Sequence, residues 1–217
     1  MTSALERPET LSEEIASSVS HGVGAALSIA GLVVLVVLAV RTGDPWRTFS
    51  VSVYGATLTL LYLVSTLYHG FQRPRVKRVF HVLDHASIFL LIAGTYTPFT
   101  LVNLRGPWGW SLFGAIWALA AVGIVFKCFF TGRFGFASVL VYIGMGWLAV
   151  IALRPALRSL GAAGLAWIAA GGAAYTLGIV FFAWRRLRYG HLVWHLFVMT
   201  GSALHFVAVL LFVLPPG

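Results

Sequence analysis

Long apolar runs alternate with short polar segments along the whole chain of 217 residues. A membrane-spanning helix needs about 20 mainly apolar residues, because each residue of an α-helix adds about 1.5 Å to its length. Seven runs reach or approach this length: 21–40, 49–69, 80–102, 110–130, 136–153, 161–184 and 191–214. The connections are rich in Arg, Gly and Pro, as turns require. The pattern therefore predicts an all-α integral membrane protein, a bundle of seven transmembrane helices.

The residues before the first run form a separate segment, 1–20, ahead of the seven-helix domain, 21–214. Thr10 and Glu13 have the spacing of a capping box, which predicts a short amphipathic helix along the membrane surface. The segment contains four glutamates and only one basic residue, Arg7, so it lacks the basic start of a signal peptide. The first apolar run is therefore expected to remain in the protein as a helix.

Composition supports the membrane assignment. Hydrophobic residues make up 59% of the chain and charged residues only 10%, whereas soluble domains carry about 25% charged residues. The net charge of +9 does not indicate nucleic acid, because nearly all of the 15 Lys and Arg residues lie between apolar runs, where they face anionic lipid. The single cysteine, Cys128, excludes an intrachain disulfide and a cysteine-based zinc cluster. We expect a multi-pass protein of the cell (inner or plasma) membrane with lipids as its partners.

The distribution of Lys and Arg predicts the orientation. The segments on the side of the N-terminus contain ten of these residues, and the segments on the opposite side contain five. Positively charged loops are retained in the cytoplasm. The N-terminal segment is therefore expected to be cytoplasmic and the C-terminus to lie outside.

Ionisable residues occur within the apolar runs, where a charge at the helix centre costs roughly 2.5–3.5 kcal/mol. Most of them share one depth, the cytoplasmic ends of their helices: His21, His69, His81, Asp84, His85, His191 and His195. Only His205 is deeper. One interpretation is that it lines a cavity leading outward together with Ser202; the other, which we expect, is that it is a satisfied interior histidine. Because several helices bring His or Asp to one depth, a shared metal site is one interpretation. The other interpretation is that these histidines are simply solvated at the membrane interface.

Spacing indicates which imidazoles are able to meet. His191 and His195 are four residues apart, so they project from one helix face and are able to share a metal. Three neutral imidazoles with an open position for water are typical of catalytic zinc. Imidazole also suits iron or nickel, so the residue types alone do not identify the metal.

Ser65 and Asp84 are the other candidates for chemistry. Ser65 lies one turn deeper than His69 on the same helix, although a serine in a membrane helix often bonds to a carbonyl of its own helix. Asp84 would orient a metal-activated water, take its proton or brace a ligand imidazole. A salt bridge from Asp84 to Lys77 or Arg78 is the alternative.

These residues lie in stretches that resemble the hemolysin III family, the bacterial branch of the progestin and adiponectin receptor (PAQR) superfamily. The matching stretches cover nearly the whole chain and are EEIASSVSHG (13–22), STLYH (65–69), LDHASI (83–88), GTYTP (94–98) and HLVWH (191–195). In the first stretch, Ser17 stands where the family usually has Asn.

The resemblance implies zinc bound by one histidine of the second helix and two of the seventh, here His69, His191 and His195. It implies that Ser65 and Asp84 lie near the zinc as catalytic residues, and it leaves the remaining histidines as bystanders. The superfamily is similar to alkaline ceramidases in its Ser, Asp and His motifs, which implies hydrolysis of an amide or ester bond of a lipid. Two other functions stay open: a signalling or sensing protein with structural zinc, and a membrane-damaging protein of the haemolysin type.

Overall fold

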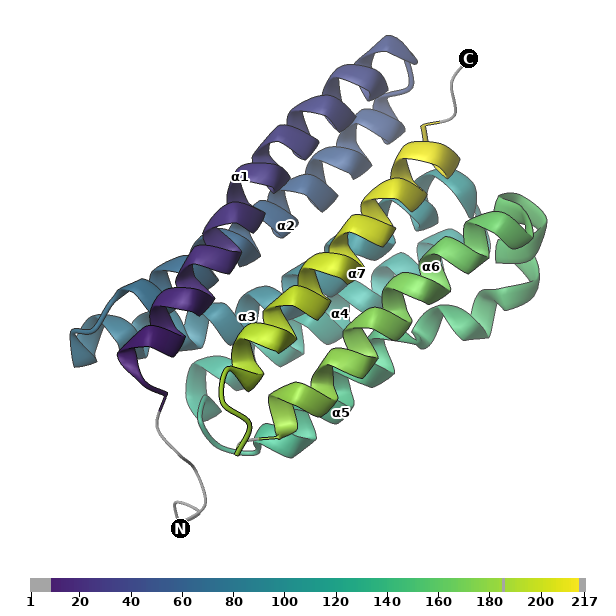
Figure 1. The fold of residues 1–217 in the computed structure, drawn as a ribbon. Coiled ribbons are helices and arrows are strands. Elements are labelled where there is room, and N and C mark those ends of the chain that lie inside the picture. Colours follow the sequence, from purple (N-terminus) through teal and green to yellow (C-terminus); the bar gives the residue numbers. More distant parts are fainter. Residues whose placement is uncertain (1–8, 185, 215–217) are drawn as a thin grey trace.

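The computed structural model describes residues 9–184 and 186–214. Within these residues the protein is all-helical and contains no strand, as predicted. Figure 1 shows a bundle in which α1 lies beside α2 and α6 lies beside α7. The elements are α1 (Leu11–Arg41), α2 (Pro45–Gly70), α3 (Pro74–Pro98), the π-helix η1 (Phe99–Asn103), α4 (Pro107–Phe130), α5 (Gly135–Gly146), the 3-10 helix η2 (Leu148–Ala152), α6 (Leu153–Ala183) and α7 (Gly190–Phe212).

By length and apolar composition, six helical stretches of the described chain are able to cross a membrane. Five of them correspond to single predicted runs, and the longest contains the predicted run 136–153 and all but the last residue of the predicted run 161–184. The stretches are Leu11–Arg41, Pro45–Gly70, Pro74–Asn103, Pro107–Phe130, Gly135–Ala183 and Gly190–Phe212. These helices are those of a multi-pass membrane protein.

The 49-residue stretch Gly135–Ala183 is not straight. Gly161 interrupts α6 with φ +67° and ψ 177°, a backbone conformation that glycine adopts readily. The indole Nε1 of Trp147 donates to Thr176 Oγ1 at 3.1 Å, although the two residues are 29 positions apart. In a straight helix they would be separated by about 44 Å. The chain therefore turns back between them, and in Figure 1 this green segment turns at the end of the bundle opposite the start of α1.

α1 begins with the predicted capping box. The Thr10 side chain accepts from the Glu13 backbone N–H at 3.4 Å, and the Glu13 carboxylate accepts from the Thr10 backbone N–H at 2.9 Å. The helix then continues to Arg41 because no proline interrupts it, so the expected separate surface helix is instead the first part of α1. Residues 1–8 of the predicted N-terminal segment, with Glu6 and Arg7, lie outside the described residues.

Prolines, a capping side chain and a left-handed residue determine where the helices with the polar residues begin. Pro45 and Pro74 begin α2 and α3, where the N–H group that proline lacks is not needed. The Asp44 side chain caps α2 by accepting from the Trp46 backbone N–H at 2.9 Å. α7 begins after Tyr189, which has a left-handed conformation with φ 58°. Figure 1 shows that the starts of α1, α3 and α7 and the end of α2 lie at one end of the bundle.

Small residues bring neighbouring helices into close contact. Gly24 of α1 lies against Tyr62 of α2, and Gly201 of α7 lies against Tyr175 of α6. A Cβ atom at either glycine would be only 2.8 Å from the tyrosine ring. Close backbone approach of this kind drives helix association in lipid, where burial of apolar surface gives no net gain. Large apolar side chains such as Phe129 face outward instead, which suits contact with lipid.

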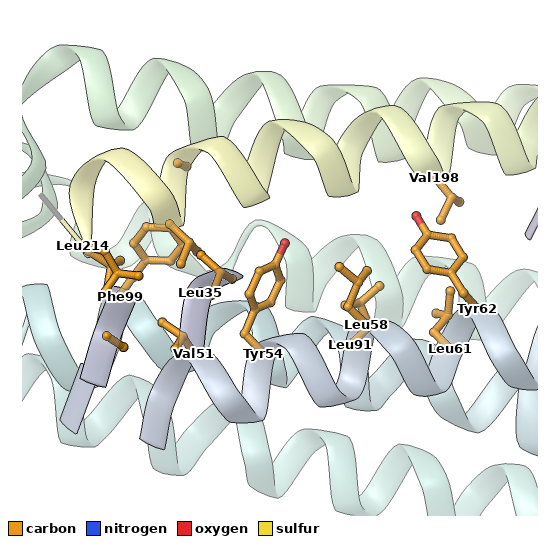
Figure 2. Packing of buried hydrophobic residues seen from close by; sticks show 14 of the residues in the cluster. Leu35, Val51, Tyr54, Leu58, Leu61, Tyr62, Leu91, Phe99, Val198 and Leu214 are labelled. Carbon is orange, nitrogen blue, oxygen red and sulfur yellow. The ribbon is translucent and has the colours of Figure 1, made fainter. Parts of the chain in front are cut away.

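Hydroxyl groups in the core connect three of the helices. Figure 2 shows Tyr54 and Tyr62 of α2 with their hydroxyl groups directed toward α7. Tyr62 donates to Ser202 Oγ at 2.8 Å, and the hydroxyl of Tyr175 on α6 is 2.9 Å from the same atom. His205 Nδ1 donates to a carbonyl of its own helix at 2.9 Å, and its ring stacks on Tyr175. His205 is therefore a satisfied interior histidine, as predicted.

Candidate metal centre

Three histidines meet at the end of the bundle where α1 begins. His69 lies in the last turn of α2, and His191 and His195 lie in the first two turns of α7. The ring centroids are 4.8 Å apart for His69 and His191, 5.0 Å for His69 and His195, and 4.7 Å for the pair on α7. Each histidine offers one ligand atom, and these three atoms all lie within 4.8 Å of one another. The fold thus brings together the three histidines that the sequence analysis assigned to a metal.

The hydrogen bonds of these histidines are compatible with a bound metal ion. His69 Nδ1 donates to Glu14 Oε2 at 2.8 Å, whereas His69 Nε2 is buried and has no hydrogen-bond partner among the described residues. His195 Nδ1 is 3.2 Å from the Ser17 carbonyl oxygen and 3.1 Å from Ser20 Oγ. Metal-binding imidazoles commonly use their second nitrogen in this way, which fixes the ring and its tautomer. A set of three imidazoles suits zinc and related metals.

Two glutamates from the start of the described chain contact His69 and His191. Glu14 is held on both sides, because Lys77 Nζ of α3 lies 2.5 Å from Glu14 Oε1. Glu9 Oε1 lies 3.2 Å from His191 Nδ1. Burial raises the pKa of the Glu9 carboxyl group, but the hydrogen bond to His191 and the charge interactions with His191 and His69 together leave the pKa below its ordinary value.

These contacts of Glu9 and Glu14 could not be predicted from the sequence pattern. The available signal was that four of the six acidic residues of the chain precede the first apolar run. The sequence alone does not link that concentration to particular histidines. The structure shows that two of these acids, Glu9 and Glu14, contact histidines on α7 and α2.

Ser65 and Asp84 lie beside the three histidines. Ser65 is one turn before His69 on α2, and its hydroxyl is close enough to the Asp84 carboxylate of α3 to interact with it. Asp84 also interacts electrostatically with His69 and His191, but it does not belong to the group of three histidines that could hold a metal. The alternative salt bridge is not formed: within the described residues, Asp84 has no ion pair with Lys77 or Arg78.

The remaining histidines at this end differ in how close they are to the centre. His21 of α1 stacks on His195, with 3.4 Å between the ring centroids and 7° between the planes. It is thus a direct neighbour of one of the three converging histidines. His81 instead stacks on Tyr68, and His85 Nδ1 donates to the His81 carbonyl at 3.0 Å, so these two pack within and beside α3.

A cavity of about 200 Å³ lies beside His191, the one histidine of the three that is not fully buried. Its walls combine carboxylates from the start of the described chain with aromatic and aliphatic side chains from α6, α7 and their connection. The lining residues are Glu9, Glu13, Phe181, Phe182, Trp184, Leu187, Tyr189, Gly190, His191 and Leu192. The cavity is therefore an amphipathic approach to the centre.

Comparison with known proteins identifies the family. The model of the family described as Haemolysin-III related matches residues 9–206. The chain belongs to this family. It is 48% identical to Hemolysin-3 of Bacillus cereus over 216 residues, which is 99% of each chain. It is 43% identical to the Hemolysin-3 homolog of Bacillus subtilis (strain 168) over 203 residues, 94% of this chain and 95% of the relative.

More distant relatives lie in animals. The human monocyte to macrophage differentiation factor is 29% identical over 172 residues, 76% of this chain and 71% of the relative. No solved structure matches the chain. The predicted membership in the hemolysin III branch of the PAQR superfamily is confirmed.

Proposed function

We propose that this protein is a zinc-dependent membrane hydrolase that cleaves an amide or ester bond of a lipid. The observation that carries the proposal is the convergence of His69, His191 and His195, with ligand atoms within 4.8 Å of one another, beside Asp84 and Ser65. Three protein ligands leave one coordination position open, which distinguishes catalytic zinc sites from structural ones. When bound there, zinc would polarise a carbonyl oxygen and lower the pKa of a water molecule to about 7.

The side chains around the three histidines would orient the reactants and move protons. Asp84 would accept the proton of the attacking water as general base. Ser65, in contact with Asp84, would hold that water or donate to the oxyanion that develops on the substrate. Glu14 engages Nδ1 of His69, which leaves its Nε2 available for the metal. The cavity at His191 would admit the substrate, since its aromatic wall suits an acyl chain.

We also propose that the chain crosses the cell membrane seven times, with the N-terminus in the cytoplasm and the C-terminus outside. The reversal within Gly135–Ala183 supports seven crossings, and the ten Lys and Arg residues against five support the orientation. Reporter fusions at the C-terminus test the topology. Alkaline phosphatase should be active and green fluorescent protein dark; the opposite pattern would overturn the orientation.

Metal content and turnover in matched variants test the enzymatic proposal. The substrates would be fluorogenic lipids of two kinds, an N-acyl amide and an O-acyl ester. Asp84→Asn should retain zinc and lose at least about 100-fold in turnover, because general-base catalysis contributes this much or more. His191→Ala should lose both zinc and turnover. A wild-type protein without turnover, or an Asp84→Asn protein that reacts at the wild-type rate, would refute this mechanism.

A structural metal is the second candidate, favoured by the contacts that surround the centre. Glu14 of α1 joins His69 of α2 to Lys77 of α3, and Ser17 of α1 accepts from His195 of α7. A metal there would hold four helices together, as a signalling or sensing protein requires. This candidate predicts that zinc removal lowers the melting temperature, while the zinc-loaded wild type hydrolyses neither lipid.

A membrane-damaging protein is the third candidate, and its support is the 48% identity to a relative named Hemolysin-3. It predicts that the purified protein releases a trapped dye from phosphatidylcholine vesicles. Retention of the dye would exclude it.

A further inference from the structure

Two polar side chains of α1 are buried beside the metal centre. Ser17 is 1% exposed and His21 is 3% exposed. Within the described part of the chain, Ser17 Oγ and both ring nitrogens of His21 find no hydrogen-bond partner. Because the two residues are four positions apart in a continuous helix, they lie on the same face of α1.

Packing explains the ring of His21 but not its nitrogens. The ring stacks on His195 at 3.4 Å between centroids, and it meets Tyr62 edge-on at 5.0 Å. A phenyl ring would make the same contacts without burying two polar atoms. Buried polar atoms nearly always have partners in native proteins, since an unpaired one is destabilising. The ring nitrogens of His21 are therefore expected to form hydrogen bonds with a group that is not part of the described chain.

The two residues border the metal centre on the side of α1. The Ser17 carbonyl oxygen accepts from His195 Nδ1, and His21 covers the face of the same ring. Neither Ser17 nor His21 is part of the converging group of His69, His191 and His195. α1 thus gives the centre a second polar surface, separate from Ser65 on α2 and Asp84 on α3.

The donor and acceptor groups of this surface define what it would bind. A serine hydroxyl donates and accepts, and a neutral imidazole also has one donor and one acceptor nitrogen. Neither group brings a fixed charge, which a buried carboxylate or ammonium ligand would need as its counterpart. The matching ligand group is one that itself donates and accepts, as a hydroxyl does.

We infer that Ser17 and His21 form a hydrogen-bonding subsite for a hydroxyl group held at the metal centre. The inference rests on the proposed function, because it assumes a ligand at that centre. The hydroxyl belongs either to the lipid headgroup or to a water molecule, and the chemistry of recognition is the same for both.

A matched pair of amide lipids separates the two sources. N-dodecanoylethanolamine carries a terminal hydroxyl, and N-propyldodecanamide has a methyl group in its place. Binding of each to zinc-loaded protein in detergent would be measured by calorimetry, with Asp84→Asn present in every protein so that neither probe is hydrolysed. In this comparison the wild type is the protein with Ser17 and His21 unchanged. If the hydroxyl comes from the lipid, the wild type should bind the hydroxylated probe about tenfold more tightly, as the loss of a buried hydrogen-bond partner implies. If it comes from water, the wild type should bind both probes equally, and the subsite variants should bind both more weakly.

The informative variants are His21→Phe, which keeps the ring stack, and Ser17→Ala. In the lipid case both should abolish the preference for the hydroxylated probe while zinc content stays unchanged. His205→Phe is the control, because it makes the same change at a buried histidine that is hydrogen-bonded within its own helix. It should keep the wild-type affinities.

Three results would overturn the inference: unchanged affinities in both subsite variants, no binding of either probe to the wild type, or loss of zinc from His21→Phe, which would make His21 a metal ligand. Zinc analysis of the same samples keeps the two proposals apart. A wild type that binds no zinc contradicts the metal centre itself. A zinc-loaded protein whose affinities do not respond to these variants contradicts only the subsite.

Discussion

Replacement of Glu14 would test whether the carboxylate brace contributes to metal binding. Its carboxylate accepts from His69 Nδ1 at 2.8 Å and from Lys77 Nζ at 2.5 Å. Glu14→Gln keeps the shape but removes the charge, and its single amide oxygen is left to serve two donors. Loss of the outer partner of a ligand histidine weakens metal binding by about 10- to 100-fold. That range corresponds to about 1.4–2.7 kcal/mol of binding free energy.

Glu14→Gln should lie near the lower end of this range. Glu14→Ala should lie near the upper end, because it leaves the His69 N–H buried without a partner and Lys77 without its counter-charge. The zinc Kd would be measured by competition with a chelating indicator in detergent. Asp44→Asn is the control, since it removes the same charge at the opposite end of α2 and should leave the Kd unchanged. A Glu14→Ala protein whose Kd stays within about twofold of the wild type would refute the reasoning.

Three further predictions concern packing, hydrogen bonding and pH. Gly94→Ala should lower the melting temperature, because its Cβ would overlap the side chain of Thr57 at a cost of about 1–3 kcal/mol. The control Gly114→Ala meets nothing within 4 Å and should be neutral or stabilising. Equal effects of the two substitutions would contradict the packing. A double-mutant cycle with Tyr62→Phe and Ser202→Ala should give a coupling of about 0.6 kcal/mol in unfolding measurements, and a coupling of zero would show that their hydrogen bond adds nothing. Zinc should be released on acidification from about pH 8 to pH 5, because protons compete for the imidazole nitrogens; a constant affinity would contradict histidine ligation.

The positions of the helices could be predicted because lipid leaves a backbone few alternatives. Every buried N–H and C=O must be satisfied inside the segment, so apolar length decides where helices lie. The interruption between α5 and η2 could not be predicted in this way. There the hydroxyl of Tyr96 on α3 accepts from the Ala149 N–H and donates to the Met145 carbonyl, both at 2.9 Å. A contact between residues about 50 positions apart leaves no periodic signal in the sequence.

The same distinction applies to the candidate centre. The spacing of His191 and His195 is a local pattern, so their shared face was visible in the sequence. The brace on His69 was not, because Glu14 is 55 positions away and reaches it only through the packing of α1 against α2. The stacking of His21 on His195 likewise depends on how α1 packs against α7.

The metal content of the purified protein tests the central claim most directly. Elemental analysis would compare the wild type with His69→Ala and with His205→Ala, a control histidine outside the centre. We predict about one zinc ion per chain in the wild type and in His205→Ala, and none in His69→Ala. A wild type that stays free of metal after incubation with zinc, or a His69→Ala protein that retains a full complement, would contradict a metal centre at these histidines.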